Sequence, residues 1–535
     1  MSLFRSINFL AVCIVFVNSI HAQNTEAIQR PNILFIMTDD HAVKAISAYD
    51  GQLNTTPNID RIANEGVKIN TGFVTNSICA PSRAVMLTGK HSHINGKTNN
   101  IYPFNWDQDN VAKQLQKGGY ETALIGKIHL KGKPQGFDYY NVLPGQGHYY
   151  NPDFIENGKK VQYPGYVTQI TTDLTLDWLK NKRNPEKPFL LLCHQKAPHR
   201  TWMPEPEHFK TFANKNFPMP ETFYDDFEGR PAAKTHKMGI INDMDWVYDL
   251  KLLDDEDEIP SRYRNGAKRN TGRMTAAQRA VWDNHYDPII KSFKTQQLSD
   301  AALNQWKYNR YLQDYLATVQ SVDDSVGEIL DYLEANNLDK NTIVIYTSDQ
   351  GFYLGEHGWF DKRFMYEESL RTPMLIKYPK EIPAGSACNA LIQNLDFAPS
   401  FLDYAGIKIP EDIQGLSFRA VLSQNSKSWR DAIFYSYYEH PSEHHVNRHF
   451  GIRTNRYKLI HFYYDQDYWE LYDLKKDPHE LENLYNRNKY KKIQTNLHHQ
   501  LNVLRSDYKD SDALNTAMIK NFNNYKANKK KNKKS

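Results

Sequence analysis

Cysteine is scarce in this chain of 535 residues, and its scarcity excludes a disulfide-rich scaffold. Only four cysteines are present, and Cys13 lies in an N-terminal segment that we expect to be removed. The three that remain are an odd number in an exported chain, so they do not form a disulfide framework. Cys193 follows four apolar residues and is expected to be an inert core thiol, whereas Cys79 lies in a distinctive motif.

Long hydrophobic runs are also rare. Residues 9–17 are apolar, follow Arg5 and precede Ala22, a pattern typical of a secretory signal peptide over residues 1–22. The run is short for a membrane span, although an uncleaved anchor is the alternative. No other segment is long enough to cross a bilayer. We therefore expect an exported protein, periplasmic or secreted, with no transmembrane segment in the mature chain.

The chain also lacks a large net charge of either sign. The net charge is +4, and residues 520–535 contain seven lysines and no acid, so the rest of the chain is close to neutral. This balance gives no case for binding nucleic acid. We predict that the lysine-rich end, residues 516–535, is a disordered solubilising tail, with loose binding of a polyanion as the alternative.

Buried strands alternate with helices through most of the chain, which predicts an α/β fold with a large, mostly parallel sheet flanked by helices. We assign residues 23–410 to this domain and residues 411–515, where shorter stretches alternate, to a smaller α+β domain with an antiparallel sheet. Residues 205–300 show little apolar periodicity. They are predicted to be an insertion over the active face, with a disordered surface excursion as the alternative. The main strands are expected at residues 32–38, 121–127, 188–195 and 342–347. The longest helix is expected at residues 303–336.

Polar side chains gather where four of these strands end, which is where open α/β sheets bind ligands. The residues are Asp39, Asp40, Lys127, His129, His199, Asp349 and Gln350. The acids and the amide offer only hard oxygen ligands, so the set suits Ca²⁺ or Mg²⁺ better than zinc.

The segment 79–89 adds a reactive group. Pro81 is expected to be the first residue of a helix that ends at Gly89, which places Cys79 just before the helix N-terminus, where an anion is favoured. Arg83 lies one turn further along, so its side chain can face the same point. With Lys127, His129, His199 and Lys362, it supplies the positive charge needed to transfer a tetrahedral oxyanion, either sulfate or phosphate.

These segments together resemble the type I sulfatases, members of the alkaline-phosphatase superfamily. The specific match is Cys79-Ala80-Pro81-Ser82-Arg83 followed by Leu87-Thr88-Gly89. Four further segments match in the order of the family: Thr38-Asp39-Asp40, Gly126-Lys127-Ile128-His129, Ala197-Pro198-His199 and Ser348-Asp349-Gln350-Gly351.

The resemblance implies that a maturing enzyme, a formylglycine-generating enzyme or maturase, oxidises Cys79 to formylglycine (3-oxoalanine) during export. One hydroxyl of its hydrate would attack sulfur, and the other would allow sulfate to be released. The implied Ca²⁺ ligands are Asp39, Asp40, Cys79, Asp349 and Gln350. Gln350 stands where the family more often has Asn.

The remaining residues receive roles by the same resemblance. Arg83 and His129 would orient the hydrate, and His129 would act as the base for sulfate release. Lys127, His199 and Lys362 would bind the sulfate, with His199 donating a proton to the leaving alcohol.

The substrate is predicted from two further segments, 355–363 and 449–454, which resemble bacterial sulfatases related to N-acetylglucosamine-6-sulfatases. They imply a sulfated polysaccharide or its oligosaccharides, such as a 6-O-sulfated N-acetylhexosamine of a glycosaminoglycan or an algal polymer such as ulvan. A polar cluster is expected either to contact the sugar or to be a solvated loop. It comprises Glu443, His444, His445, Arg448 and His449.

Two other functions stay open on the sequence alone. One is a phosphodiester or phosphonate monoester hydrolase of the same superfamily. The other is a non-catalytic secreted protein that binds glycans.

Overall fold

The computed structural model describes residues 30–532 except 255, 257, 426 and 427, so the predicted signal peptide lies outside the described residues. Its main feature is a ten-stranded sheet in the order β13-β2-β12-β9-β1-β8-β4-β5-β6-β7. The central strands are all parallel: β9 (Thr342–Ser348), β1 (Asn32–Thr38), β8 (Phe189–His194), β4 (Glu121–Lys127) and β5 (Tyr139–Leu143). Their carboxyl ends therefore meet at one edge of the sheet.

The outer strands make the sheet mixed. β12 runs antiparallel to β9 and to β2, β13 runs parallel to β2, and β6 and β7 extend the other side in antiparallel fashion. Their bounds are β12 (Met374–Lys377), β2 (Val67–Ile69), β13 (Ser386–Cys388), β6 (Asp153–Glu156) and β7 (Lys159–Gln162). The predicted α/β fold with a parallel core is confirmed, and the antiparallel flanks are the feature that the buried runs did not reveal.

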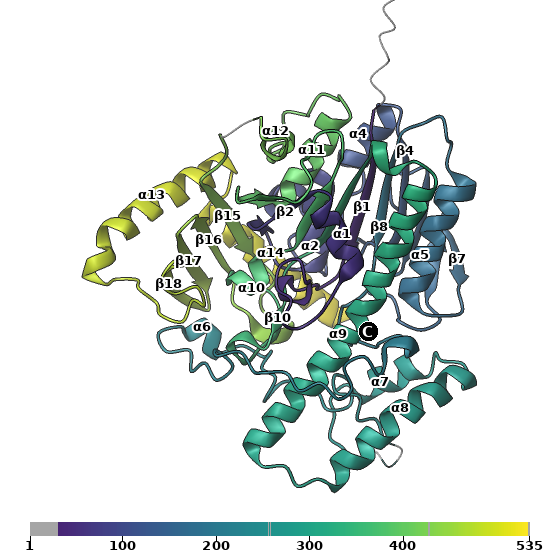
Figure 1. The fold of residues 1–535 in the computed structure, drawn as a ribbon. Helices are drawn as coiled ribbons and strands as arrows, with labels where there is room; N and C mark the ends of the chain where they lie inside the picture. The colour runs from purple at the N-terminus through teal and green to yellow at the C-terminus, as the bar shows by residue number, and fades with distance from the viewer. Residues whose placement is uncertain (1–29, 255, 257, 426–427, 533–535) are drawn as a thin grey trace, which may run out of the picture.

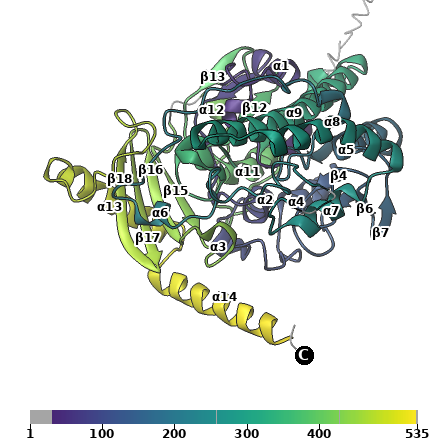
Figure 2. The same ribbon diagram turned by 90° about the horizontal axis from the view of Figure 1, so that it is seen from below.

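Helices cover both faces of the sheet (Figure 1 and Figure 2). Side chains alternate along a strand, so Leu34 and Ile36 of β1 pack on one face while Ile33 and Phe35 pack on the other. The first face is covered by α1 (Pro57–Asn64), α5 (Val167–Asp177) and α9 (Asp300–Ala335). The second face is covered by α2 (Cys79–Thr88), α4 (Val111–Lys117) and α11 (Phe397–Tyr404). Burial on both faces explains why the central strands are continuously apolar.

Residues 205–300 are structured wherever they are described, so the alternative of a disordered excursion is wrong. The segment contains α6 (Pro231–Lys234), α7 (Arg264–Thr271) and α8 (Ala276–Thr295). Phe217, Phe223 and Met238 are buried in one hydrophobic cluster with residues of α9. Their apolar side chains are spread through irregular loops, which have no period for sequence analysis to detect.

The C-terminal region forms the predicted antiparallel sheet, with four strands. They are β15 (Ala432–Tyr437), β16 (His449–Thr454), β17 (Tyr457–Tyr464) and β18 (Gln466–Asp473). Helix α13 (Lys491–Asp507) packs against one face of this sheet. Ile433, Tyr435 and Phe462, on the other face, join the cluster that also buries the insertion.

The prediction of a disordered tail from residue 516 is wrong for the described residues. Helix α14 (Asp512–Asn532) occupies this segment and runs away from the small sheet as a separate rod (Figure 2). Phe522 is 1% exposed and lies against Tyr102 and the guanidinium of Arg448. This apolar anchor outweighs the polar composition of the segment, which alone suggested disorder.

His449 on β16 makes stability depend on pH. Its ring is buried, accepts a hydrogen bond from Met365 N (3.1 Å) and stacks on Phe364. Burial lowers the pKa of His449 from 6.5 to about 4. The unfolded chain therefore binds a proton below pH 6.5 that the folded chain does not, so this contribution to stability is lost as pH falls toward 4.

As pH falls from 6.5 toward 4, we expect the free energy of unfolding of the protein with His449 to decrease, relative to a His449→Gln variant, by about 1.4 kcal/mol per pH unit. Urea denaturation of both proteins at pH 7, 6, 5 and 4.5 measures it. A difference between them that does not change with pH would contradict the neutral, buried state of His449.

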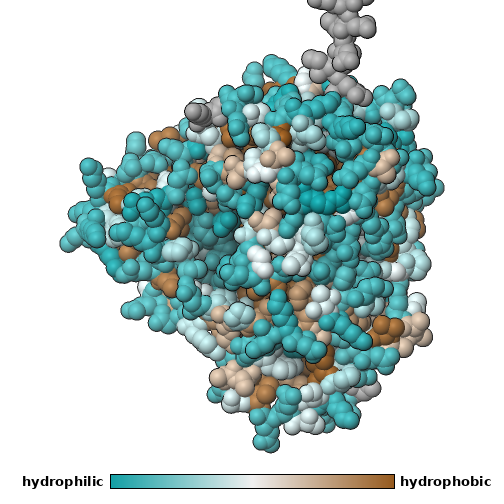
Figure 3. Space-filling view, in the orientation of Figure 1, coloured by the Kyte–Doolittle hydropathy of each residue, from teal (hydrophilic) through white to brown (hydrophobic). Residues whose placement is uncertain are grey.

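The surface and the helices carry no long hydrophobic element among the described residues. The face in Figure 3 is mostly hydrophilic, with hydrophobic residues in small groups. Within the described ranges, no helix combines the length and the hydrophobicity needed to span a bilayer.

Candidate active site

Two strand ends bring three carboxylates together. β1 runs directly into Asp39 and Asp40, and β9, its neighbour, runs into Asp349. All three side chains are completely buried, and each offers an oxygen within 4.8 Å of the others. Asp40 has a positive φ of 68° and its N–H donates to Asp349 Oδ1 (3.2 Å). The predicted convergence of these acids is therefore what the structure shows.

The acids fit a hard divalent cation. Gln350 is fully buried beside them, and its Oε1 has no hydrogen-bond partner while its Nε2 donates to Asp40 Oδ1. Burial raises the pKa of Asp40 to about 6, although Lys362 opposes the shift. Three buried carboxylates and a free amide oxygen are a ligand set that Ca²⁺ or Mg²⁺ would stabilise.

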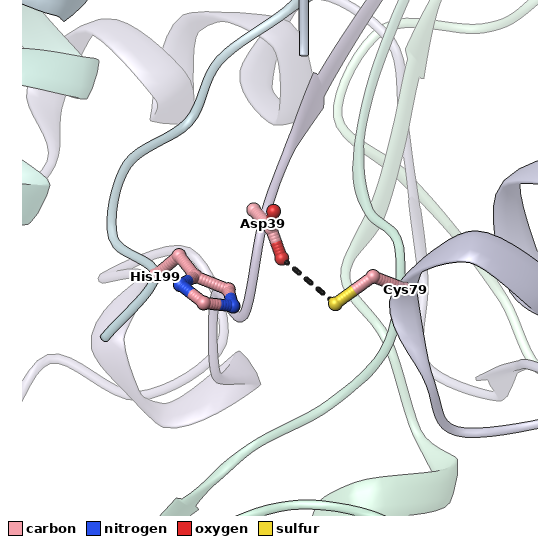
Figure 4. Close-up of side chains that lie close together, drawn as sticks. All are labelled: Asp39, Cys79 and His199. Atoms are coloured by element: carbon pink, nitrogen blue, oxygen red, sulfur yellow. Dashed lines mark hydrogen bonds between the residues drawn. The ribbon is translucent and has the colours of Figure 1, made fainter. Parts of the chain in front are cut away.

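Cys79 faces this cluster from the start of a helix. Its Sγ lies 3.4 Å from Asp39 Oδ1, and His199 points into the same space (Figure 4). The helix begins at Cys79 and not at Pro81, which occupies its third position, and it ends at Gly89 with φ 64° as predicted. Pro81 still falls in the first turn, where its missing N–H costs nothing.

The helix N-terminus is less free than the sequence suggested. The N–H of Ala80 donates to Asn100 Oδ1 (3.1 Å), and Ser82 N donates to Ile78 O (3.0 Å). An anion beside Cys79 would therefore be held mainly by side chains.

The thiol of Cys79 is not activated. Burial raises its pKa to about 12, and the nearby Lys362 only partly offsets that effect. A thiol with this pKa stays protonated at neutral pH, and thiolate is the nucleophilic form. With these neighbouring charges, Cys79 is therefore a thiol and not a thiolate.

Arg83 connects helix α2 to the main sheet through hydrogen bonds. Its Nε and Nη2 both lie 2.9 Å from Asp349 Oδ2, and Nη1 donates to the carbonyl of Lys127. Arg83 is 1% exposed, so these contacts are desolvated. The structure thus places Arg83 on Asp349, where it links α2 to the strands β9 and β4.

Two lysines complete the cluster. Lys127 Nζ contacts Asp39 Oδ2, and Lys362 Nζ lies 2.6 and 2.8 Å from the two oxygens of Asp40. With Arg83, three cations thus face three carboxylates, and a divalent cation would leave a net positive charge. That excess suits a sulfate ester, which carries one negative charge.

Both predicted histidines lie at this edge of the sheet and are held neutral. Burial, reinforced by Lys127, lowers the pKa of His199 and of His129 well below 6.5. His199 Nε2 lies 3.8 Å from Asp40 Oδ2, and its Nδ1 is 2.6 Å from the carbonyl of Arg200. His129 is half-buried with a positive φ of 53°, and its shielded Nδ1 has no hydrogen-bond partner.

Sequence reasoning missed two cations next to His199. Lys196 is 4% exposed, and its pKa falls to about 8, chiefly through burial. Arg200 makes two hydrogen bonds of 2.7 Å to Asp249, a residue of the insertion. Lys196 directly precedes the matched segment Ala197-Pro198-His199, which was the available signal. The partner of Arg200 could not be found, because Asp249 lies 49 positions further along the chain.

The Arg200–Asp249 pair should hold the His199 loop in place. We expect Asp249→Ala to lower the free energy of unfolding by about 3–5 kcal/mol, because it leaves a buried guanidinium without its carboxylate. An Arg200→Met, Asp249→Leu double variant should recover most of that loss. Urea denaturation of the three proteins measures it, and a cost below about 1 kcal/mol for Asp249→Ala would show that the pair is solvated.

The polar cluster at 443–449 divides into two groups. Glu443 lies 3.7 Å from Arg200, and His444 Nε2 lies 3.2 Å from Asp361 Oδ2, so both approach the site. Arg448 and His449 are buried in packing contacts instead. Arg448 and His449 are therefore packed apart from Glu443 and His444, whose contact with a sugar stays a prediction.

Comparisons with known proteins agree with the motifs. Residues 31–407 match the family model described as Sulfatase, and residues 355–507 match that described as N-sulphoglucosamine sulphohydrolase, C-terminal. The chain is 49% identical over 494 residues to N-acetylglucosamine-6-O-sulfatase of Bacteroides thetaiotaomicron, covering 91% of this chain and 88% of the relative. It is 24% identical over 512 residues to the ulvan-active sulfatase of Formosa agariphila, covering 92% and 84%.

Solved structures extend the comparison. The structure of BT4656 in complex with its substrate D-glucosamine-2-N,6-O-disulfate has a TM-score of 0.87 at 49% identity, covering 90% of this chain and 99% of that one. The phosphonate monoester hydrolase of Agrobacterium radiobacter has a TM-score of 0.66 at 19% identity, covering 90% and 96%, a likeness of fold alone. The match of the sulfatase model to most of the chain, together with 49% identity to a sulfatase, shows that this protein belongs to the sulfatase family of sulfuric ester hydrolases.

Proposed function

We propose that this sulfatase removes the 6-O-sulfate of a glucosamine residue in a sulfated polysaccharide or its oligosaccharides. The observation that carries the proposal is the single buried cluster in which Cys79, three carboxylates and three cations meet. The relative at 49% identity is named for N-acetylglucosamine-6-O-sulfate, and the similar structure holds a 6-O-sulfated glucosamine. These names support glucosamine over an algal polymer such as ulvan, whose named relative is 24% identical.

Formylglycine at position 79 would supply a hydrated aldehyde as the nucleophile, and Ca²⁺ held by Asp39, Asp40, Asp349, Gln350 and residue 79 would supply positive charge beside it. The high pKa of the thiol supports the precursor role of Cys79, because the unmodified side chain has little thiolate character. A formylglycine-generating enzyme or maturase would act before or during export. The predicted signal peptide, and with it a periplasmic or secreted location, belongs to the same proposal.

The cations of the chain would bind and orient the sulfate. Lys127 and Lys362 are paired with Asp39 and Asp40 in this structure, and a cation on those acids would free both ammonium groups for sulfate oxygens. Arg83 would hold Asp349 and the start of α2 in place through its two contacts. These groups are already desolvated, so their attraction for the transition state is stronger than in water.

The histidines would move protons. His199 is neutral because burial and the lysines disfavour its charged form, and a bound sulfate would offset the lysines and raise its pKa. His199 could then protonate the leaving sugar oxygen from Nε2, while its Nδ1–H donates to the carbonyl of Arg200. His129, neutral and with a free Nδ1, would accept a proton during sulfate release.

A substrate comparison tests the proposal. We expect matured protein to release sulfate from N-acetylglucosamine-6-sulfate with a kcat/KM at least about 100-fold above that for an aryl phosphodiester. This ratio corresponds to a difference of about 2.7 kcal/mol in activation free energy. Galactose-6-sulfate and a 3-O-sulfated glucosamine serve as matched sulfate esters. Faster turnover of the phosphodiester would favour the related hydrolase class, and faster turnover of either matched ester would overturn the assignment to 6-O-sulfated glucosamine.

A further inference from the structure

A cavity opens beside the catalytic cluster. It has a volume of about 270 Å³ and lies on the side of His199 that faces the insertion. Its wall combines the loop after β5, the loop after β8, and Tyr248 and helix α7 of the insertion. The residues that matter are Gln146, His148, Lys196, His199, Arg200 and Arg269.

This cavity is joined to the sulfate end of the site. His199 and Lys196 line it and also lie close to Asp40 and Lys362, which interact with them electrostatically. Gln146, another wall residue, accepts a hydrogen bond from Lys127 Nζ through its Oε1. A molecule bound at the cluster can therefore extend into the cavity without leaving protein contact.

The wall is positively charged. Its charged members are Lys196, Arg200 and Arg269, and no carboxylate is among the described residues that line it. Asp249 already neutralises Arg200. Lys196 and Arg269 are the cations left to attract a ligand.

Lys196 is buried although its ammonium group has no ion-pair partner in the part of the chain that the structure describes. Its side chain is 96% buried, and its Nζ lies 4.6 Å from the centre of the Tyr149 ring. Among the described residues, no hydrogen bond or ion pair to the ammonium group is found, and Asp40 attracts it only from beyond ion-pair distance. A buried cation of this kind is costly unless an anion joins it, so the position is poised for a negatively charged ligand group.

We infer that this cavity binds a second anionic group of the substrate, a sulfate, sulfamate or carboxylate in addition to the ester that is hydrolysed. The inference rests on the proposed function, and it names the substrate class more closely: a 6-O-sulfated glucosamine with further negative charge on the same sugar or on its neighbour. The disulfated substrate of BT4656 has this charge pattern, although its name does not say which residues meet the second group.

Paired substrates test the inference. On the same sugar, glucosamine-6-sulfate carrying an N-sulfo group is compared with the N-acetyl form. On the neighbour, a disaccharide with a uronate is compared with its carboxyl-reduced form. We expect the matured protein to favour the more anionic member of at least one pair about 10-fold in kcat/KM, and the pair that responds identifies which sugar carries the group.

Charge variants connect that preference to the cavity. Arg269→Glu is expected to reduce the ratio of the two kcat/KM values at least about 10-fold, mainly through KM. Lys268→Gln is the matched control, since it removes a neighbouring charge of α7 that does not line the cavity, and its ratio should stay unchanged. Lys196→Met should lower the ratio as well.

The outcomes separate the two proposals. Desulfation of both members of each pair at equal rates, unaltered by Arg269→Glu, would overturn the second anion site and leave the proposed function standing. Failure to desulfate any 6-O-sulfated glucosamine would instead overturn the proposed function.

Discussion

Replacing Cys79 with serine is expected to abolish turnover, lowering kcat for a 6-sulfated N-acetylglucosamine by about 1,000-fold or more. A serine offers one hydroxyl, whereas a hydrated aldehyde offers two on one carbon. Serine could take the sulfuryl group but would have no second hydroxyl to expel it, so the protein would stop after one event. Sulfate release under multiple-turnover conditions measures the loss.

The matched control is Cys193→Ala. Cys193 is equally buried, on β8, but its Sγ accepts a hydrogen bond from Thr175 Oγ1 (3.4 Å) within the hydrophobic core. We expect the control to keep near-normal kcat while losing some stability, and Cys79→Ser to keep a normal melting temperature. Sustained turnover by Cys79→Ser would contradict the requirement for formylglycine.

Removal of the metal is expected to have the next largest effect. A chelator should lower kcat/KM by about 100- to 1,000-fold, because a bound cation contributes several kcal/mol to stabilising charge in the transition state. The loss should be reversed by added Ca²⁺. Asp349→Asn should show a similar loss that Ca²⁺ does not restore, because the variant lacks one of three converging carboxylates.

The physical reason lies in how the cations are paired. With Asp39 and Asp40 unneutralised, they hold Lys127 and Lys362, as they do in this structure. Metal removal should therefore raise KM as well as lower kcat. Asp331→Asn, at an exposed acid paired with Arg61, is the matched control and should be neutral. Full activity after exhaustive chelation would contradict a metal at this cluster.

Sequence periodicity predicted the centre of the fold closely. The strand at 32–38 and the strand at 121–127 have the predicted limits, since continuous apolar runs bounded by polar residues are unambiguous when both faces are buried. The same logic placed Asp39, Asp349 and Lys127 at one sheet edge, because parallel strands end together.

Other parts depended on contacts that no local pattern contains. The insertion is ordered by scattered aromatic side chains such as Phe217 and Phe223, and α14 is anchored by Phe522. Arg200 finds its partner in a distant loop. The pairing of Lys127 with Asp39 and the isolation of Lys196 likewise follow from tertiary geometry.

The most direct test of the account relates activity to the chemistry of residue 79. Protein would be prepared with graded maturation, and mass spectrometry of the peptide containing residue 79 would give the fraction of chains with formylglycine. We expect kcat for sulfate release from N-acetylglucosamine-6-sulfate to rise in proportion to that fraction and to vanish at zero. Full activity in chains that retain the Cys79 thiol would contradict the account.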